Sequence, residues 1–135
     1  MLLVDTNVLL AAADRSAPEH LVCSELLDRD DNLIVSAPVV IECAWMIESR
    51  LGAVAEAAFV SSIARRELRC IDLVADDWAR CAELIQEYAD LRLGLVDASV
   101  VTIAERLGLS TLATLNRRDF AVVRPRHVEA FKLVP

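Results

Sequence analysis

The sequence is poor in aromatic residues and in the two residues that most often interrupt secondary structure. Only 4% of its 135 residues are aromatic, and it has three glycines and four prolines. So few glycines and prolines leave little room for long loops, and no linker, internal repeat or low-complexity segment is present. Disorder is excluded as well, because 56% of the residues are hydrophobic. We therefore expect one globular domain over residues 1–135, long enough to bury a sizeable core.

Long apolar runs and closely paired cysteines are also missing. No apolar stretch approaches the roughly 20 residues that span a bilayer. No basic segment precedes the first apolar stretch, as it would in a secretory signal. The four cysteines show no close pairing, which favours buried free thiols over disulfides or a zinc site. These features predict a cytoplasmic protein that does not bind membranes.

Positive charge is scarce and is concentrated near one end. The formal net charge is −7, which argues against simple electrostatic binding of nucleic acid. Residues 1–116 carry nine basic and 19 acidic side chains, whereas residues 117–135 carry five basic and two acidic ones. This basic segment could hold a phosphate backbone beside an acidic centre. On charge alone, an ordinary solvated C-terminal segment is equally consistent.

Short apolar strands alternate with helices along the chain. Strands are predicted at residues 2–5, 33–35, 70–73, 111–114 and 131–134. Helices are predicted directly after Asp5, at 18–31, from Ser36 to about Leu51, at 53–67, from Asp76 or Asp77, and at 95–107. Such alternation is typical of a parallel sheet that is covered on both faces. The predicted fold class is α/β, a three-layer α/β/α sandwich around a short parallel sheet.

Three carboxylates stand where apolar residues are expected. Asp5 follows the first strand, Glu42 lies in the nearly all-apolar helix APVVIECAWMI, and Asp97 falls on the predicted buried face of its helix. Each has a structural explanation: a helix cap for Asp5, an ion pair for Glu42, and a favourable helix-dipole position for Asp97. Together they are harder to explain, because adjacent carboxylates destabilise one another and residues 1–14 contain no basic side chain.

A divalent cation would resolve this crowding of negative charge. Mg²⁺ and Mn²⁺ take oxygen ligands and typically bind one or two carboxylates beside a phosphate. Open parallel sheets bind ligands beyond the carboxyl ends of their strands, where Asp5 is expected. This pattern predicts that Asp5 binds a metal ion.

Several short motifs follow one another in a defined order. They are the hydrophobic–Asp–Thr–Asn opening, the Glu of the third helix, the Asp of VDAS, and the closing TLNRRDF…RP. In these motifs the chain resembles the PIN-domain ribonucleases, and more narrowly the VapC toxins of bacterial toxin–antitoxin pairs. Asp5, Glu42 and Asp97 match the three acids of that family. Thr6 matches a hydroxyl residue beside the first acid, and Thr114 matches a polar residue at the edge of the site, so we expect both to contact the substrate.

The resemblance carries further implications. It implies a compact α/β/α fold and RNA cleavage that depends on Mg²⁺ or Mn²⁺. In that hydrolysis Asp5 and Asp97 would hold the metal, and Glu42 would orient the attacking water or take its proton. It also implies a homodimer and inhibition by a cognate antitoxin, which we expect to cover an apolar groove near the third and fourth helices. Four arginines of the basic segment are the candidates to hold the RNA backbone: Arg117, Arg118, Arg124 and Arg126.

One position departs from the family pattern. The family usually has a fourth acid where this chain has Asn116, and Asp119 follows three residues later. If these residues form a helical turn, which the polar NRRD run favours, their side chains are neighbours. Asn116 and Asp119 are therefore the candidates to complete the metal site. We expect one well-held metal, with Asp119 acting through water or pairing with a neighbouring arginine.

Two alternatives to a ribonuclease remain at this stage. One is a PIN-fold interaction module that has lost the metal, which Asn116 supports. The other is a receiver-type phosphoacceptor domain, which also has an acidic pocket at the strand ends. That domain needs a lysine after a late strand, and the only lysine is Lys132. Trp45, Trp78 and Phe59 occupy helical apolar positions, so we expect them in the core.

Overall fold

A computed structural model describes all residues, Met1 to Pro135. Its centre is a five-stranded parallel sheet in the order β3-β2-β1-β4-β5. The strands are β1 (Leu2–Val4), β2 (Leu33–Ser36), β3 (Leu68–Ile71), β4 (Thr111–Ala113) and β5 (Lys132–Val134). Because β1 is the middle strand, the residue that follows it lies between neighbouring strands on both sides. That residue is Asp5.

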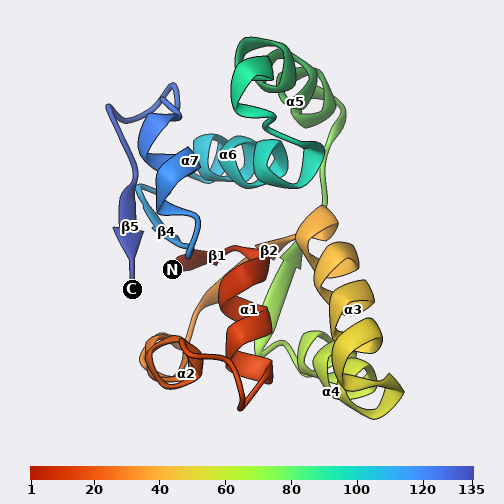
Figure 1. The fold of residues 1–135 in the computed structure, drawn as a ribbon. Helices are drawn as coiled ribbons and strands as arrows, with labels where there is room; N and C mark the ends of the chain where they lie inside the picture. The colour runs from red at the N-terminus through yellow and green to blue at the C-terminus, as the bar shows by residue number, and fades with distance from the viewer.

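Helices cover both faces of the sheet. They are α1 (Thr6–Ala13), α2 (His20–Asp28), α3 (Ala37–Leu51), α4 (Ala53–Ala64), α5 (Ala75–Glu87), α6 (Leu95–Leu107) and α7 (Arg117–Val122), with a short 3₁₀ helix η1 (Ala89–Leu91). Figure 1 shows α1 to α4 on one side of the strands and α5 to α7 on the other. This arrangement confirms the predicted three-layer α/β/α sandwich. None of the helices is both long and apolar enough to cross a membrane.

Helix capping explains why polar residues gather at the carboxyl ends of the strands. Asp5 directly follows β1, and its carboxylate accepts a hydrogen bond from the main-chain N–H of Thr6 at the start of α1. Ser36 ends β2 and caps α3, and Asn116 caps α7 shortly after β4. A side-chain oxygen at such a position satisfies an N–H group that has no partner within the helix. Tight strand-to-helix turns therefore place oxygen atoms along one edge of the sheet.

The core fixes the elements that carry these turns. The strands contribute Leu3 and Ile34, and the helices contribute Ile47 and Ile103, all fully buried. Phe120 anchors the short α7 by packing edge-on against Phe131, with ring centroids 6.3 Å apart. Truncating a buried phenylalanine typically costs about 3–5 kcal/mol, so α7 is firmly held. All four cysteines are free thiols, and three are buried as predicted, whereas Cys70 on β3 is only partly buried.

Some local predictions are wrong. Strand β3 starts two residues earlier than predicted, because Leu68 pairs in register with Leu33 of β2 and is buried there. The helices predicted at 18–31 and 53–67 are shorter at their ends, and the second stops before Arg66, which has a left-handed backbone.

The two tryptophans predicted in the core are on the surface. The exposed fractions of Trp45 and Trp78 are 69% and 52%, and Phe59 is only partly buried. Helix α3 buries the face formed by Val39, Cys43 and Ile47, which turns Trp45 outward.

Candidate active site

The three predicted acids meet in one cavity at the carboxyl ends of the strands. The cavity has a volume of about 280 Å³ and is lined by Asp5, Thr6, Asn7, Leu10, Glu42, Met46, Arg50, Asp97 and Asn116. Its residues come from both helix layers, since α1 and α3 lie on one side of the sheet and α6 and α7 on the other (Figure 1). Residues far apart in the sequence therefore converge at the place where open parallel sheets bind ligands.

Asp5 is the most deeply buried of these acids, with 3% of its surface exposed. One carboxylate oxygen accepts a hydrogen bond from the N–H of Thr6 at 2.8 Å, and the other accepts one from the Thr114 hydroxyl at 2.8 Å. Burial raises the pKa of Asp5, although both hydrogen bonds oppose the shift. Thr114 is itself fully buried and accepts a hydrogen bond from the N–H of Asn116. This position favours a role in holding Asp5 over the predicted contact with substrate.

Asp97 lies in the first turn of α6, is half-buried, and has no ion-pair partner. Its pKa is raised to about 6, first by burial and then by the negative charges of Asp5, Glu42 and Asp119. No positive side chain contributes to the pKa of Asp97. The carboxylates are thus close enough to repel one another, and no positive side chain offsets this repulsion at Asp5 or Asp97.

Asn116 and Asp119 occupy the first turn of α7, which confirms the predicted helical turn. The Asn116 amide donates a hydrogen bond to the Asp119 carboxylate at 3.0 Å. Asp119 does not line the cavity, but its charge raises the pKa of Asp97. The nearest arginine contact is long, 3.9 Å from Arg118, whose side chain is 91% exposed, so this pair contributes little. Asn116 therefore stands between Asp119 and the cavity.

The donor atoms of the cavity suit a hard divalent cation. They are carboxylate, hydroxyl and amide oxygens, and the buried hydroxyl oxygen of Thr6 has no hydrogen-bond partner. No three acid, histidine or cysteine side chains are close enough to form a complete protein metal site. Mg²⁺ does not require one, because it usually keeps several waters and binds one or two carboxylates. Asp5 and Asp97 fit that requirement.

The four predicted RNA-binding arginines divide into two groups. Arg117 and Arg118 lie exposed at the start of α7, close to the acidic cavity. Arg124 donates to main-chain carbonyl groups at the end of the same helix. Arg126 forms an ion pair with Glu83 at 2.7 Å and lines a different cavity, beside α5 and α6. The structure does not bring Arg126 to the acids.

Arg50 is a residue that sequence reasoning missed. It lines the acidic cavity together with Glu42 and Met46. These three residues of α3 are spaced by four, so they form one stripe along the helix. That spacing was visible in the sequence and was the only available signal.

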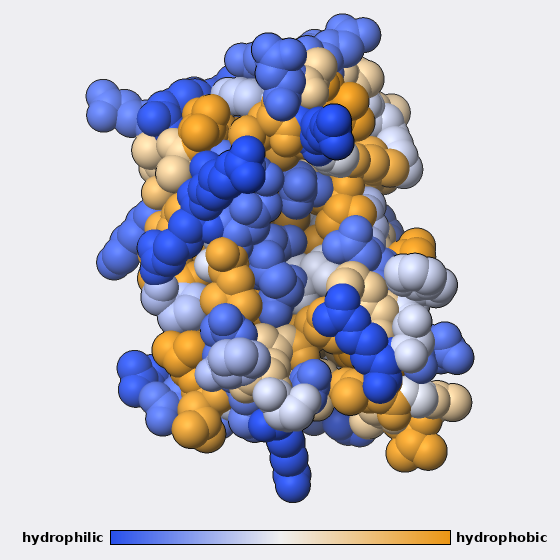
Figure 2. All heavy atoms as spheres, viewed as in Figure 1, coloured by the Kyte–Doolittle hydropathy of each residue, from blue (hydrophilic) through white to orange (hydrophobic).

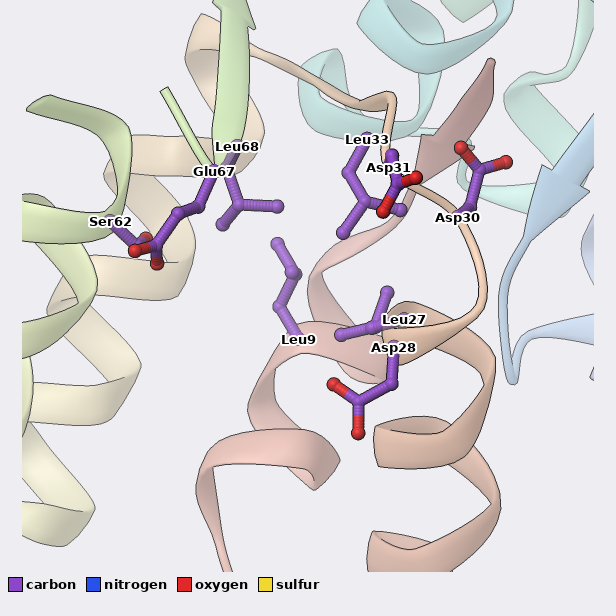
Figure 3. A pocket seen from close by; sticks show the side chains of 9 residues that line it. All are labelled: Leu9, Leu27, Asp28, Asp30, Asp31, Leu33, Ser62, Glu67 and Leu68. Atoms are coloured by element: carbon purple, nitrogen blue, oxygen red, sulfur yellow. The ribbon is translucent and has the colours of Figure 1, made fainter. Parts of the chain in front are cut away.

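A larger cavity lies at the opposite edge of the sheet, where the strands begin. It has a volume of about 510 Å³ and is lined by Leu9, Leu27, Asp28, Asp30, Asp31, Leu33, Ser62, Glu67 and Leu68. Figure 3 shows its leucines pointing toward one another, with the carboxylates placed around them. None of the predicted site residues lies there.

Comparisons with known proteins agree with this geometry. Residues 2–124 match the sequence profile of the PIN domain. The chain is 33% identical to Ribonuclease VapC26 of Mycobacterium tuberculosis over 135 residues, 99% of this chain and 100% of that protein.

Solved structures show the same fold. One is VapC20 of M. tuberculosis, a sarcin–ricin loop cleaving toxin, with a TM-score of 0.78, 18% identity, and coverage of 83% of this chain and 87% of the other. Another is a toxin–antitoxin complex from Klebsiella pneumoniae, with a TM-score of 0.71 and 23% identity. The match covers 100% of this chain and 97% of the other. The acidic cavity at the strand ends, the sequence profile and the VapC relative agree, and the chain belongs to the PIN-domain family as a VapC-type member.

Proposed function

We propose that the chain is an endoribonuclease that hydrolyses RNA phosphodiester bonds with Mg²⁺ or Mn²⁺ and acts as the toxin of a toxin–antitoxin pair. The observation that carries this proposal is the convergence of Asp5, Glu42 and Asp97 in one cavity, where no positive side chain lowers the pKa of Asp5 or Asp97. The 33% identity to a protein named as a ribonuclease supports the choice of RNA as the substrate.

Each acid has a distinct part in this mechanism. Asp5 and Asp97 would hold the metal ion, which, when bound, lowers the pKa of a water molecule and offsets charge on the phosphate. Thr114 fixes the Asp5 carboxylate in place through its hydrogen bond. Glu42 is half-buried and borders the same cavity, so it can orient the attacking water or take its proton. The hydroxyl of Thr6 lines the same cavity without a hydrogen-bond partner, so it would be free to bond to the substrate.

RNA binding must rely on local contacts, because the net charge of the chain is −7. Arg118 is the best placed to bind the phosphate backbone, because it is exposed beside the cavity and its only ion-pair contact, with Asp119, is long at 3.9 Å. Arg117 is exposed there too, but its guanidinium group donates a hydrogen bond to the main-chain carbonyl of Pro135. Arg124 and Arg126 would contribute less, because main-chain carbonyls and Glu83 already accept hydrogen bonds from their guanidinium groups.

A protein partner is supported by the surface over α3 and α4. Ile41, Trp45 and Val54 have exposed fractions of 72%, 69% and 87%, and α4 has no buried residue. Figure 2 shows hydrophobic side chains at the surface over these helices. A cognate antitoxin would cover this apolar surface, and the structural relative from K. pneumoniae was solved as a toxin–antitoxin complex. We also propose that the chain forms a homodimer, which light scattering of the purified protein tests; a monomer contradicts it.

A second candidate function is a PIN-fold interaction module without catalysis, which Asn116 favours because it removes one acid. The receiver-type domain is no longer a candidate, because the chain belongs to the PIN-domain family.

The deciding experiment is an RNA cleavage assay in the presence of Mg²⁺ or Mn²⁺. We expect cleavage by the wild type, none in EDTA, and a loss of at least about 1,000-fold in Asp5→Asn and Asp97→Asn, because each removes a charged metal ligand. Circular dichroism checks that the variants fold. Wild-type cleavage by both variants contradicts the proposed site, and an inactive wild type supports the interaction module.

A further inference from the structure

The acidic cavity continues into a second hollow along α1. This hollow, here called the α1–α2 hollow, has a volume of about 430 Å³ and is lined by Asn7, Leu10, Ala11, Asp14, Ser16, Ala17, Pro18, Glu19, Arg50 and Leu115. It shares Asn7, Leu10 and Arg50 with the acidic cavity. The two spaces therefore form one groove that starts at the acids and ends at the turn between α1 and α2.

Arg50 stands at the junction of these spaces, and its charge adds to the hydrogen bonds from Ser16 in lowering the pKa of Asp14. Its side chain is exposed and makes no hydrogen bond or ion pair within the chain. It contributes nothing to the raised pKa values of Asp5 and Asp97, so it is not their counter-ion. It follows Glu42 by eight residues, which is about 12 Å along a helix. A short single-stranded segment spans that distance from the acids.

The α1–α2 hollow has the chemistry of a base-binding surface rather than a phosphate site. Its lining includes the apolar residues Leu10, Ala11 and Leu115, of which the first two are buried, and its volume is in the range of small-ligand pockets. Asp14 and Glu19 also line it, and Glu19 is exposed. The pKa of Asp14 is lowered by hydrogen bonds from Ser16, so this carboxylate is ionised. Negative charge there repels phosphate but accepts hydrogen bonds from the amino groups of a base.

We propose that Arg50 and the α1–α2 hollow form a nucleotide-binding subsite for single-stranded RNA. Arg50 binds a phosphate with its guanidinium group, and an unpaired base enters the hollow with its amino group toward Asp14. A base in a duplex cannot do this, because its edge is occupied by its pairing partner. The subsite rests on the proposed ribonuclease function and names the form of the RNA that the groove accepts.

The first test measures binding of a labelled single-stranded RNA to an Asp97→Asn background, in which no cleavage occurs. We expect Arg50→Ala to weaken binding about tenfold, because a charge-assisted hydrogen bond is lost. The slope of log K against log salt should fall by about 0.7, the value for one phosphate on a single strand. Arg50→Lys should keep most of the slope. The matched control is Arg29→Ala, which removes an exposed helix-end arginine outside the groove.

The second test locates the base. In the Asp97→Asn background, abasic nucleotides are introduced at one RNA position at a time, and one position should weaken binding. Ala17→Phe, which fills the hollow, should abolish the sensitivity at that position and leave the salt slope intact.

The outcomes separate the two proposals. If wild-type protein cleaves RNA but Arg50→Ala binds and cleaves like Arg29→Ala, the subsite is wrong and the ribonuclease function stands. If the wild type neither binds nor cleaves RNA, both proposals fail. Thermal melts of each variant check the fold, and Arg50→Gln replaces Arg50→Ala if the latter is unstable.

Discussion

Carboxylates lie at both edges of the parallel sheet, where the strands begin and where they end, and they differ in burial and in ion-pair partners. At the edge where the strands begin, Asp28, Asp30, Asp31 and Glu67 surround a leucine-lined cavity (Figure 3). Asp30 pairs with the N-terminal ammonium group at 3.7 Å, and Glu67 pairs with Arg65 at 2.8 Å, which lowers the pKa of Glu67. At the edge where the strands end, burial and neighbouring acids raise the pKa of Asp97 to about 6. The number of acids at the two edges is similar, and their solvation and partners differ.

Helix polarity adds to this difference. The N-termini of α1, α3, α6 and α7 lie where the strands end, and the positive end of each helix dipole favours negative charge there. Asp28 instead occupies the last residue of α2, where a carboxylate is unfavourable. Acids at the beginning of the strands therefore keep their charge through solvent and ion pairs. Asp5, Asp97 and Asp119 instead lie at or near helix N-termini, whose dipoles favour their negative charge.

The largest effect that separates the two edges is stabilisation by metal. Saturating Mg²⁺ or Mn²⁺, at about 100 times the dissociation constant, should raise the free energy of unfolding of the wild type by about 2.7 kcal/mol. Asp5→Asn should abolish this gain, whereas the double variant Asp30→Asn, Asp31→Asn should keep it. Thermal melts with and without the ion measure both. If only the double variant loses the gain, the ion binds at the opposite edge.

The second effect is the pH dependence of stability without metal. The pKa of Asp97 is about 6 in the folded chain, against an ordinary value of 3.8. Asp97 therefore ionises at a lower pH in the unfolded chain than in the folded one. As a result, this group lowers the free energy of unfolding progressively as the pH rises from about 4 to 6. Asp97→Asn should remove the decline. Near neutral pH it should stabilise the protein by about 1–2 kcal/mol, after allowance for solvent screening of a partly exposed group.

The opposite edge supplies the control for this pH effect. The pKa of Glu67 is lowered by Arg65, so Glu67 contributes stability above its ordinary pKa and loses it as the pH falls. Glu67→Gln should therefore destabilise slightly at neutral pH, the opposite sign to Asp97→Asn. Urea unfolding at several pH values measures both variants. The same sign for both would mean that the two edges do not differ as described.

Much of this site could be predicted from local sequence, because its residues perform local tasks. Asp5 and Asn116 begin helices, and helix α6 spans residues 95–107 as predicted, because Gly108 at φ 68° ends it. The strand-to-helix pattern then determines which edge of the sheet receives Asp5 and Asp97. Local rules and fold class were sufficient for these residues.

The rest depends on contacts between segments that no local pattern specifies. Arg126 pairs with Glu83, 43 residues away in the sequence, and so lies apart from the acids. Trp45 follows the apolar pattern of α3 but lies outside its buried face. Arg50 acquires its position only when α3 packs beside α1. Composition and periodicity identify apolar and charged positions without stating which partner each one meets.

The smallest expected effects concern Asn116 and Asp119, which show how far the acidic edge extends. An asparagine oxygen can bind Mg²⁺ or Mn²⁺ but adds no charge, and Asn116 lines the cavity while Asp119 does not. Asn116→Asp should therefore tighten Mn²⁺ binding, by about tenfold if it adds 1.4 kcal/mol of attraction, and raise the cleavage rate.

Asp119→Ala should reduce cleavage less than Asp5→Ala, because the Asp119 carboxylate accepts a hydrogen bond from Asn116 and acts on the cavity only through its charge. Calorimetry with Mn²⁺ and cleavage rates measure both variants. If Asp119→Ala folds and is as inactive as Asp5→Ala, Asp119 is the fourth acid of the site and Asn116 is its support.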